Sequence, residues 1–188
     1  MELKAFLSHR YRSPEVNLYF HELFAESAQI QFEVDIGSLP TNVTRLERMI
    51  RDADAFIGIY PFPGDPKKTA SADELRNASK YFRLECELAI RSGKPSLVFL
   101  DRRYAPYFDF SPSIRVESFD IQEIAGKGGS PSRPRFRRVF LEFCDELSAM
   151  MTATAAKRRP YFEMQVGIIV PTDDKAQEAR YEPNTSRQ

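Results

Sequence analysis

Glu85 has the sequence surroundings that a carboxylate needs for chemistry at a sugar carbon. It lies in residues 79–89 (SKYFRLECELA), where helical spacing places Tyr81, four residues earlier, on the same face. Its apolar neighbourhood, with Leu84 before it and Cys86 after it, predicts partial burial and a raised pKa. Such a carboxylate can stabilise an oxocarbenium-like transition state or attack an anomeric carbon. The alternative is that Glu85 is an ordinary surface residue.

Arginine and tyrosine side chains gather where four predicted strands end. Ligands of open parallel sheets bind beyond the carboxyl ends of the strands, where arginine suits phosphates and tyrosine suits rings. His9 is a further candidate for phosphate binding or for capping a loop, whereas His21 is assigned a structural role. The alternative is that loop ends are polar everywhere. The four strand ends are at Ser8, Asp35, Tyr60 and Asp101.

Several familiar sites are missing from the sequence. No G-x-G-x-x-G follows the first strand and no G-x-x-x-x-G-K-[ST] occurs, which excludes the common dinucleotide and P-loop signatures. No glycine flanks Ser8 as it would in a hydrolase elbow. Two histidines and two cysteines, widely scattered, predict no structural zinc site.

The composition places the chain among globular proteins. Its 188 residues are 42% hydrophobic and 29% charged, and 27 basic residues balance 27 acidic ones. A general nucleic-acid coat or a polybasic membrane anchor would need an excess of base. No apolar run reaches the roughly 20 residues that span a bilayer, and the start of the sequence does not read as a signal peptide. We therefore expect a cytoplasmic protein in which Cys86 and Cys144 are reduced thiols.

Strand and helix patterns alternate along the chain, which predicts an α/β fold with a mainly parallel sheet of five strands flanked by helices. Apolar runs or alternation predict the strands, and apolar residues at helical spacing predict the helices. Four arginines near the start of the last helix (Arg133, Arg135, Arg137 and Arg138) could bind an acidic partner or nucleic acid, although a solvated face is favoured. The predicted strands are residues 4–8, 30–36, 55–60, 96–100 and 114–119, and the predicted helices are residues 14–29, 43–53, 73–92 and 136–150.

The chain divides by pattern into a domain over residues 1–152 and an extension over residues 153–188. Residues 161–170 (YFEMQVGIIV) predict one more strand, and about 15 polar residues after them are expected to be disordered. The strand has two interpretations. It adds to the edge of the sheet, or it begins a further domain beyond this chain, which is slightly favoured.

The motifs, taken in order, resemble those of TIR (Toll/interleukin-1 receptor) domains over about residues 2–151. The segment around Glu85, which matches their S-x-W-[CV]-x-x-E signature as S-x-Y-F-x-x-E, is the most specific part. The other matches are individually weak and count because of their order. They are residues 5–12 (AFLSHRYR) as first strand and loop, residues 32–42 as second strand and BB loop, residues 43–60 as helix and apolar strand, and residues 93–95 (GKP) before the next strand.

This resemblance implies a flavodoxin-like sheet and, in the enzymatic members of the family, cleavage of NAD+ at the nicotinamide–ribose bond. The catalytic glutamate carried over by position is Glu85, since Glu87 would break the spacing to Tyr81. The family's aromatic residue at that position is usually tryptophan, and tyrosine leaves a weaker ring contact. Ser8, His9 and Arg10 are then expected to line the pocket, and Tyr60 and Tyr81 to stack or shape it. The gating loop is expected at Gly37, Ser38, Leu39 and Pro40.

The resemblance also implies partners. NAD+ would be the substrate, with no metal or bound cofactor, and activity would follow self-association through TIR–TIR contacts under a fused or associated sensor domain. Family habit places such enzymes in bacterial antiphage defence. Neither a membrane nor nucleic acid is indicated as a partner.

Two other functions stay open. One is a non-catalytic TIR-like signalling module, in which Glu85 would be incidental. The other is a nucleoside deoxyribosyltransferase-like enzyme, because residues 85–95 also match that group's E-x-x-x-A-x-x-x-G-K-P segment. That reaction would need a second carboxylate, for which Asp35 and Asp101 are the candidates. Both enzymatic relatives cleave an N-glycosidic bond at C1′.

Overall fold

A computed structural model describes residues 3–9, 14–26, 30–35, 42–63, 69–107, 110–124 and 133–154. Several sequence predictions lie outside these residues: Arg10, the gating loop from Gly37 to Pro40, the strand over residues 161–170 and the disorder expected after it. The domain limits at residues 152 and 153 stay predictions.

The core of the molecule is a five-stranded sheet in which every pairing is parallel. The strand order is β2-β1-β3-β4-β5, the order of flavodoxin-like folds. The strands are β1 (Leu3–His9), β2 (Ile30–Glu33), β3 (Ala55–Tyr60), β4 (Ser96–Asp101) and β5 (Ile114–Phe119). The predicted α/β fold with a parallel sheet of five strands is therefore confirmed.

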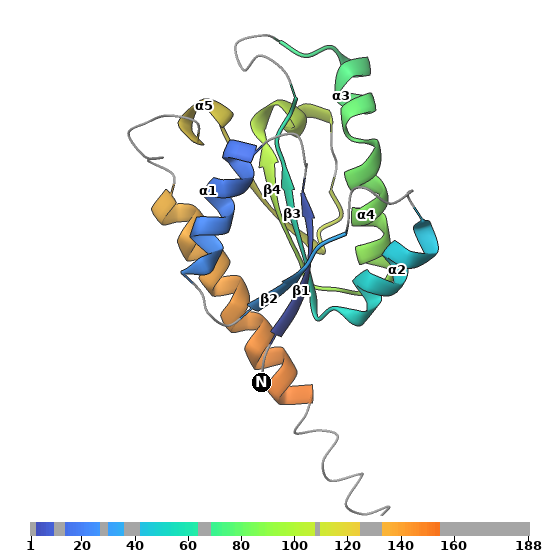
Figure 1. Cartoon of the computed structure of the whole chain (residues 1–188), viewed down its shortest axis with the longest axis vertical. Coiled ribbons are helices and arrows are strands. Elements are labelled where there is room, and N and C mark those ends of the chain that lie inside the picture. The colour runs from blue at the N-terminus through green and yellow to red at the C-terminus, as the bar shows by residue number, and fades with distance from the viewer. Residues whose placement is uncertain are drawn as a thin grey trace, which may run out of the picture. The chain divides into compact units, whose positions relative to one another are not determined.

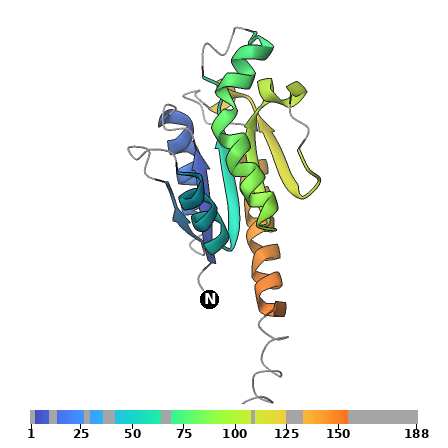
Figure 2. The same cartoon turned by 90° about the vertical axis from the view of Figure 1, so that its right-hand side faces the viewer.

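Helices cover both faces of the sheet, because each parallel connection must cross over it. Figure 1 shows α1 on one face and α3 and α4 on the other, and Figure 2 shows α2 beside α4. None of the helices in the described ranges combines the length and apolar character that a bilayer crossing needs. The helices are α1 (Pro14–Ala25), α2 (Val43–Asp52), α3 (Ala72–Ala78), α4 (Lys80–Arg91), the 3-10 helix η1 (Arg102–Tyr107), α5 (Ile121–Ile124) and a last helix over residues 133–154.

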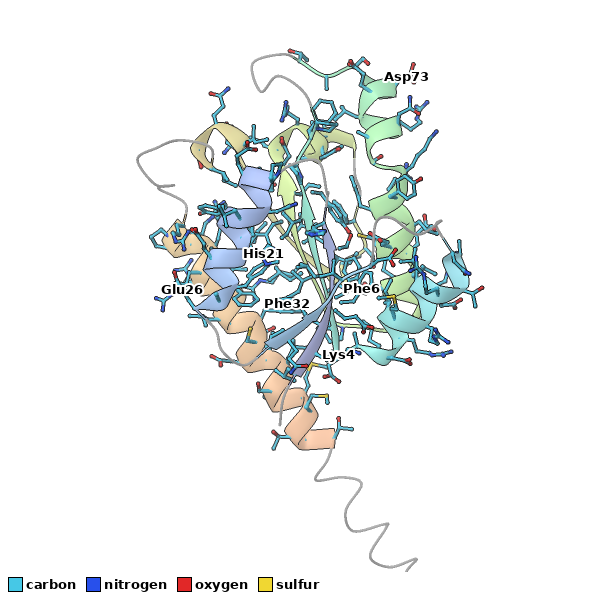
Figure 3. The ribbon with its side chains drawn as sticks, in the orientation of Figure 1. Lys4, Phe6, His21, Glu26, Phe32 and Asp73 are labelled. Carbon is cyan, nitrogen blue, oxygen red and sulfur yellow. The ribbon has the colours of Figure 1, made fainter. Side chains whose placement is uncertain are left out.

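Aromatic rings fill the face of the sheet that α1 covers. Phe20 of α1 is completely buried, and its ring centroid lies 4.7 Å from that of Phe99 in β4. It also contacts Phe119 of β5 and Phe136 of the last helix. Figure 3 shows His21 and Phe32 on the α1 side of the sheet. Phe20 thus joins two strands and two helices in one core.

A second core lies between the sheet and α2, α3 and α4. It follows from strand alternation: β1, β3 and β4 turn every second side chain to this face. The core is mainly hydrophobic, and at the carboxyl ends of β1 and β3 Ser8 and Tyr60 bring hydroxyl groups into it. The largest hydrophobic side chains are Phe6, Leu46, Ile50, Phe56, Phe62, Phe82, Leu88 and Tyr104.

The helix predicted over residues 73–92 is interrupted, so that expectation was wrong at Ser79. Ser79 is completely buried, and its hydroxyl donates to the carbonyl of Arg76 at 2.9 Å. Its own N–H closes the last turn of α3 on Leu75, and α4 starts at the next residue. A serine hydroxyl competes in this way with the helical backbone.

The second strand is shorter than the alternation predicted. Pairing with β1 ends at Glu33, and Asp35 lies in the coil that follows. Two short elements were not predicted, η1 and α5. Both lie in segments whose polar, aromatic and proline residues give no sustained period.

The arginines that open the last helix make contacts within the domain. Arg133 forms an ion pair with Glu26 at 3.1 Å and lies over the ring of Tyr19. Arg137 also pairs with Glu26, which lies at the end of α1 (Figure 3). Arg135 donates to the Ser118 carbonyl at 2.7 Å. These contacts join the last helix to α1 and β5, so the cluster has a structural role.

Replacing Phe20 by Ala should destabilise the fold by about 3–5 kcal/mol, because it leaves a cavity among at least three other rings. Urea denaturation followed by circular dichroism measures this loss. The matched control is Leu18→Ala on the same helix, whose side chain is 60% exposed and which should change the free energy of unfolding by less than about 0.5 kcal/mol. Equal effects of the two variants would contradict the core described here.

Candidate functional site

Glu85 lies on the border of the buried face of α4. Phe82, Cys86 and Ala89 of this helix are buried, whereas Glu85 itself is half-buried. The Ser8 hydroxyl, near the carboxyl end of β1, donates to Oε2 of Glu85. A residue at this position of α4 therefore faces the carboxyl end of the sheet, where ligands bind in open α/β folds.

Three further groups continue from Glu85 into the core. The Tyr60 hydroxyl donates to Ser8 Oγ at 2.6 Å, and the Cys86 thiol contacts the Tyr60 hydroxyl at 3.9 Å. We call Cys86, Tyr60, Ser8 and Glu85 the hydroxyl chain. The ring of Tyr60 stacks on Phe82, with centroids 4.1 Å apart and planes 21° apart. The hydroxyl chain thus runs from the middle of the core to the half-buried carboxyl of Glu85.

Gly58 gives the Tyr60 ring its space. Gly58 lies directly opposite Ser8 in the β1–β3 pairing. A Cβ atom at Gly58 would lie 2.7 Å from Cε2 and 3.0 Å from the hydroxyl oxygen of Tyr60, closer than real side-chain contacts. A glycine inside a buried strand commonly marks such a close approach. The tyrosine hydroxyl reaches Ser8 because residue 58 has no side chain.

The site favours the protonated form of Glu85 more than exposure to water would. Burial is the main cause that raises the pKa of Glu85 from its ordinary 4.5 to about 7, and the negative charge of Asp35 adds to it. The hydrogen bond from Ser8 acts in the opposite direction, because it stabilises the ionised carboxylate. Near neutral pH, Glu85 can therefore both hold and release a proton.

The rest of the hydroxyl chain stays neutral. Burial raises the pKa of the Cys86 thiol to about 12 and the pKa of Tyr60 well above its ordinary value. Glu85 is thus the member of the chain that changes charge near neutrality.

The two candidates for a second carboxylate lie in different surroundings. Asp35 interacts electrostatically with Glu85 and forms an ion pair with Arg45 of α2, at 2.8 Å. Asp101 is 1% exposed and is bound by Arg103 at 2.7 Å and by the Phe62 N–H at 3.1 Å. Asp101 therefore ties together the segments after β3 and β4, and Asp35 is the carboxylate that acts on Glu85.

The structure brings together only some of the residues that the sequence singled out. Ser8 and Tyr60 join Glu85 in the hydroxyl chain. His9 follows Ser8 in β1 and turns to the opposite face, where its ring lies 6.2 Å from that of His21. Tyr81 is 68% exposed, so it does not enclose the carboxyl.

Glu87, the alternative to Glu85, is exposed and faces Arg91 at 3.9 Å. Its surroundings are those of an ordinary surface residue.

Sequence reasoning missed Gly58, Phe82 and the thiol of Cys86 as parts of the site. One signal was present: a lone glycine inside the apolar run of residues 55–60 (AFIGIY). The contacts of Phe82 and Cys86 depend on the rotation of α4, which sequence spacing alone does not define. Among the described residues, no group of three or more His, Cys, Asp or Glu side chains is arranged to hold a metal ion.

Comparisons with known proteins give no family. No family model and no curated protein matches the chain. Among solved structures, it is similar to an NADPH-quinone reductase from P. pentosaceus, at 11% sequence identity and a TM-score of 0.30, over 78% of this chain and 79% of that one. A likeness this distant carries no argument about function.

The raised pKa of Glu85 predicts a pH dependence of stability. A raised folded-state pKa contributes stability that is complete below the unfolded value of 4.5 and is lost as the pH rises through about 7. The free energy of unfolding of the native chain, measured relative to that of Glu85→Gln, should fall by up to about 3 kcal/mol as the pH rises across this window. Urea denaturation at a series of pH values measures the difference.

The control for this series is Glu87→Gln, which removes an exposed carboxylate of the same helix. It shows what the loss of a glutamate from this helix does without the burial of Glu85. A flat difference between the native chain and Glu85→Gln across the pH window would contradict the prediction.

Gly58→Ala should destabilise the fold by about 1–3 kcal/mol, because the new methyl group collides with the Tyr60 ring. The same change should cost less in a Tyr60→Ala chain, where the ring is absent. A double-mutant cycle of unfolding free energies measures this coupling. Additive effects would mean that Gly58 is needed for a reason other than the ring.

Proposed function

We propose that this chain is a TIR-like NAD+ glycohydrolase whose catalytic residue is Glu85. The observation that carries the proposal is the half-buried Glu85 carboxyl, hydrogen-bonded by Ser8 at the carboxyl end of a parallel strand. Such a carboxylate suits stabilisation of positive charge on a ribose ring. The order of the TIR-like motifs supplies the substrate class, and the resemblance extends to both sides of this site.

The reaction divides into bond cleavage and capture by water. The C1′–N bond breaks, and nicotinamide leaves with the electron pair, which neutralises its ring. The ionised Glu85 stabilises the charge that develops at C1′ while Ser8 holds its oxygen in place. Water then adds to C1′ and releases a proton, giving ADP-ribose. A cyclic product would form instead if a group of the same nucleotide captured C1′.

The ionisation of Glu85 gives this mechanism a pH dependence. Only the carboxylate form stabilises an oxocarbenium ion, so cleavage should increase as the pH rises through about 7. Because the site is partly solvated, water screens the charge of Glu85 and weakens its stabilisation of the positive charge at C1′. Packing of a neighbouring copy against the site would exclude that water.

We therefore propose activation by self-association through TIR–TIR contacts, under a sensor that follows residue 152 or associates with the chain. The setting would be cytoplasmic bacterial antiphage defence. NAD+ is the substrate, and no metal or bound cofactor takes part.

Each of the two alternatives has one observation in its favour. The exposure of Tyr81 favours a non-catalytic TIR-like module, because the aromatic residue expected beside the glutamate stands in solvent. The interaction of Asp35 with Glu85 favours a deoxyribosyltransferase-like enzyme, because it supplies a second carboxylate. The ion pair of Asp35 with Arg45 weakens the latter, since it occupies both carboxylate oxygens.

Glu85→Gln should reduce nicotinamide release from NAD+ by a factor of at least ~10², because the amide keeps the shape but carries no charge. Chromatography of concentrated or crowded protein incubated with NAD+ measures the release. Glu87→Gln is the matched control and should retain activity, since its side chain points to solvent. Undiminished nicotinamide release by Glu85→Gln would refute the assignment. If the native chain released the base of a nucleoside but no nicotinamide from NAD+, the transferase would be favoured.

A further inference from the structure

The sequence analysis expected Tyr60 to stack on a ligand or to shape the pocket. In the structure it is not placed to stack on a ligand. Its side chain is 3% exposed, and its ring packs against Phe82 and close to Gly58. Its hydroxyl is directed to Ser8, which in turn contacts Glu85. In this arrangement the Tyr60 hydroxyl is linked to the Glu85 carboxyl by way of Ser8.

We propose that Tyr60 is a positioning residue, whose buried hydroxyl donates to Ser8 Oγ and thereby turns the Ser8 proton toward the Glu85 carboxylate. The inference goes beyond the proposed function, because it concerns the ionisation of Glu85 and holds whether or not the chain cleaves NAD+. It also explains the glycine at position 58, because a side chain there would collide with the Tyr60 ring.

The proton inventory supports this direction. An ionised Glu85 has no proton to donate, so the single proton of Ser8 must point to it. The oxygen of Ser8 then accepts from Tyr60, and the oxygen of Tyr60 accepts from Cys86. Each donation strengthens the next, and the effect is largest when the final acceptor is charged. Loss of the Tyr60 hydroxyl should therefore penalise ionised Glu85 more than protonated Glu85.

The polar and charged groups near Glu85 come from several elements. Ser8 approaches from β1, Tyr60 from β3 and Cys86 from α4 itself. Asp35, after β2, contributes its negative charge, and Arg45 of α2 is paired with it. Replacing Tyr60 by Phe changes none of these charges and preserves the ring that stacks on Phe82.

The test follows the titration of Glu85 by NMR of carboxyl-labelled glutamate, assigned with Glu85→Gln. Tyr60→Phe should raise the titration midpoint by about 0.5 units, about threefold in proton affinity, and Ser8→Ala should raise it by about one unit, about tenfold. In a Ser8→Ala chain, Tyr60→Phe should add no further shift, because the tyrosine acts through Ser8.

The matched control is Tyr104→Phe. Tyr104 lies in η1, is completely buried and also packs on Phe82, with ring centroids 5.2 Å apart. This variant should leave the midpoint where it is in the native chain. The proposal fails if Tyr60→Phe leaves the midpoint unchanged, if Tyr104→Phe shifts it equally, or if the Tyr60 effect persists undiminished without Ser8. None of these outcomes depends on NAD+ cleavage, which is measured separately.

Discussion

The hydrogen bond between Ser8 and Glu85 is the contact on which the site depends. It joins the end of β1 to the middle of α4 and places one charge-changing group against an otherwise neutral chain. Burial and the field of Asp35 favour the protonated carboxyl, and Ser8 favours the ionised one. The balance of these opposing effects brings the pKa of Glu85 close to neutrality, where small changes in surroundings decide its charge.

The fold supplies this balance through ordinary features of parallel sheets. The strand order places β1 and β3 side by side, so Ser8 and Tyr60 end on one face and at one edge. The stacking of Phe82 on Tyr60 packs α4 against the sheet. The aromatic core around Phe20 stabilises the opposite face without entering the site.

Sequence patterns predicted the architecture well and the site in part. An apolar run predicted β3 and an alternating pattern predicted β5, each with the bounds that the structure shows, because strands are short and are flanked by polar or turn-forming residues. Strand ends placed Ser8 and Tyr60 at one edge of the sheet, and the resemblance to TIR domains joined Glu85 to them. Sequence reasoning ended the first strand at residue 8, whereas β1 includes His9, and strand alternation turns this side chain to the face opposite Ser8. It could not foresee the exposure of Tyr81, which follows from the rotation of α4 about its axis.

Infrared difference spectroscopy would test the central claim, that Glu85 holds a proton near neutrality, most directly. Spectra of the native chain would be recorded about one pH unit below and one above the value of about 7, with Glu85→Gln as the reference. A protonated-carboxyl band that is present at the lower pH, disappears at the higher pH and is missing from the variant is the predicted result. Spectra without this band at the lower pH would show that Glu85 is already ionised, and would contradict the claim.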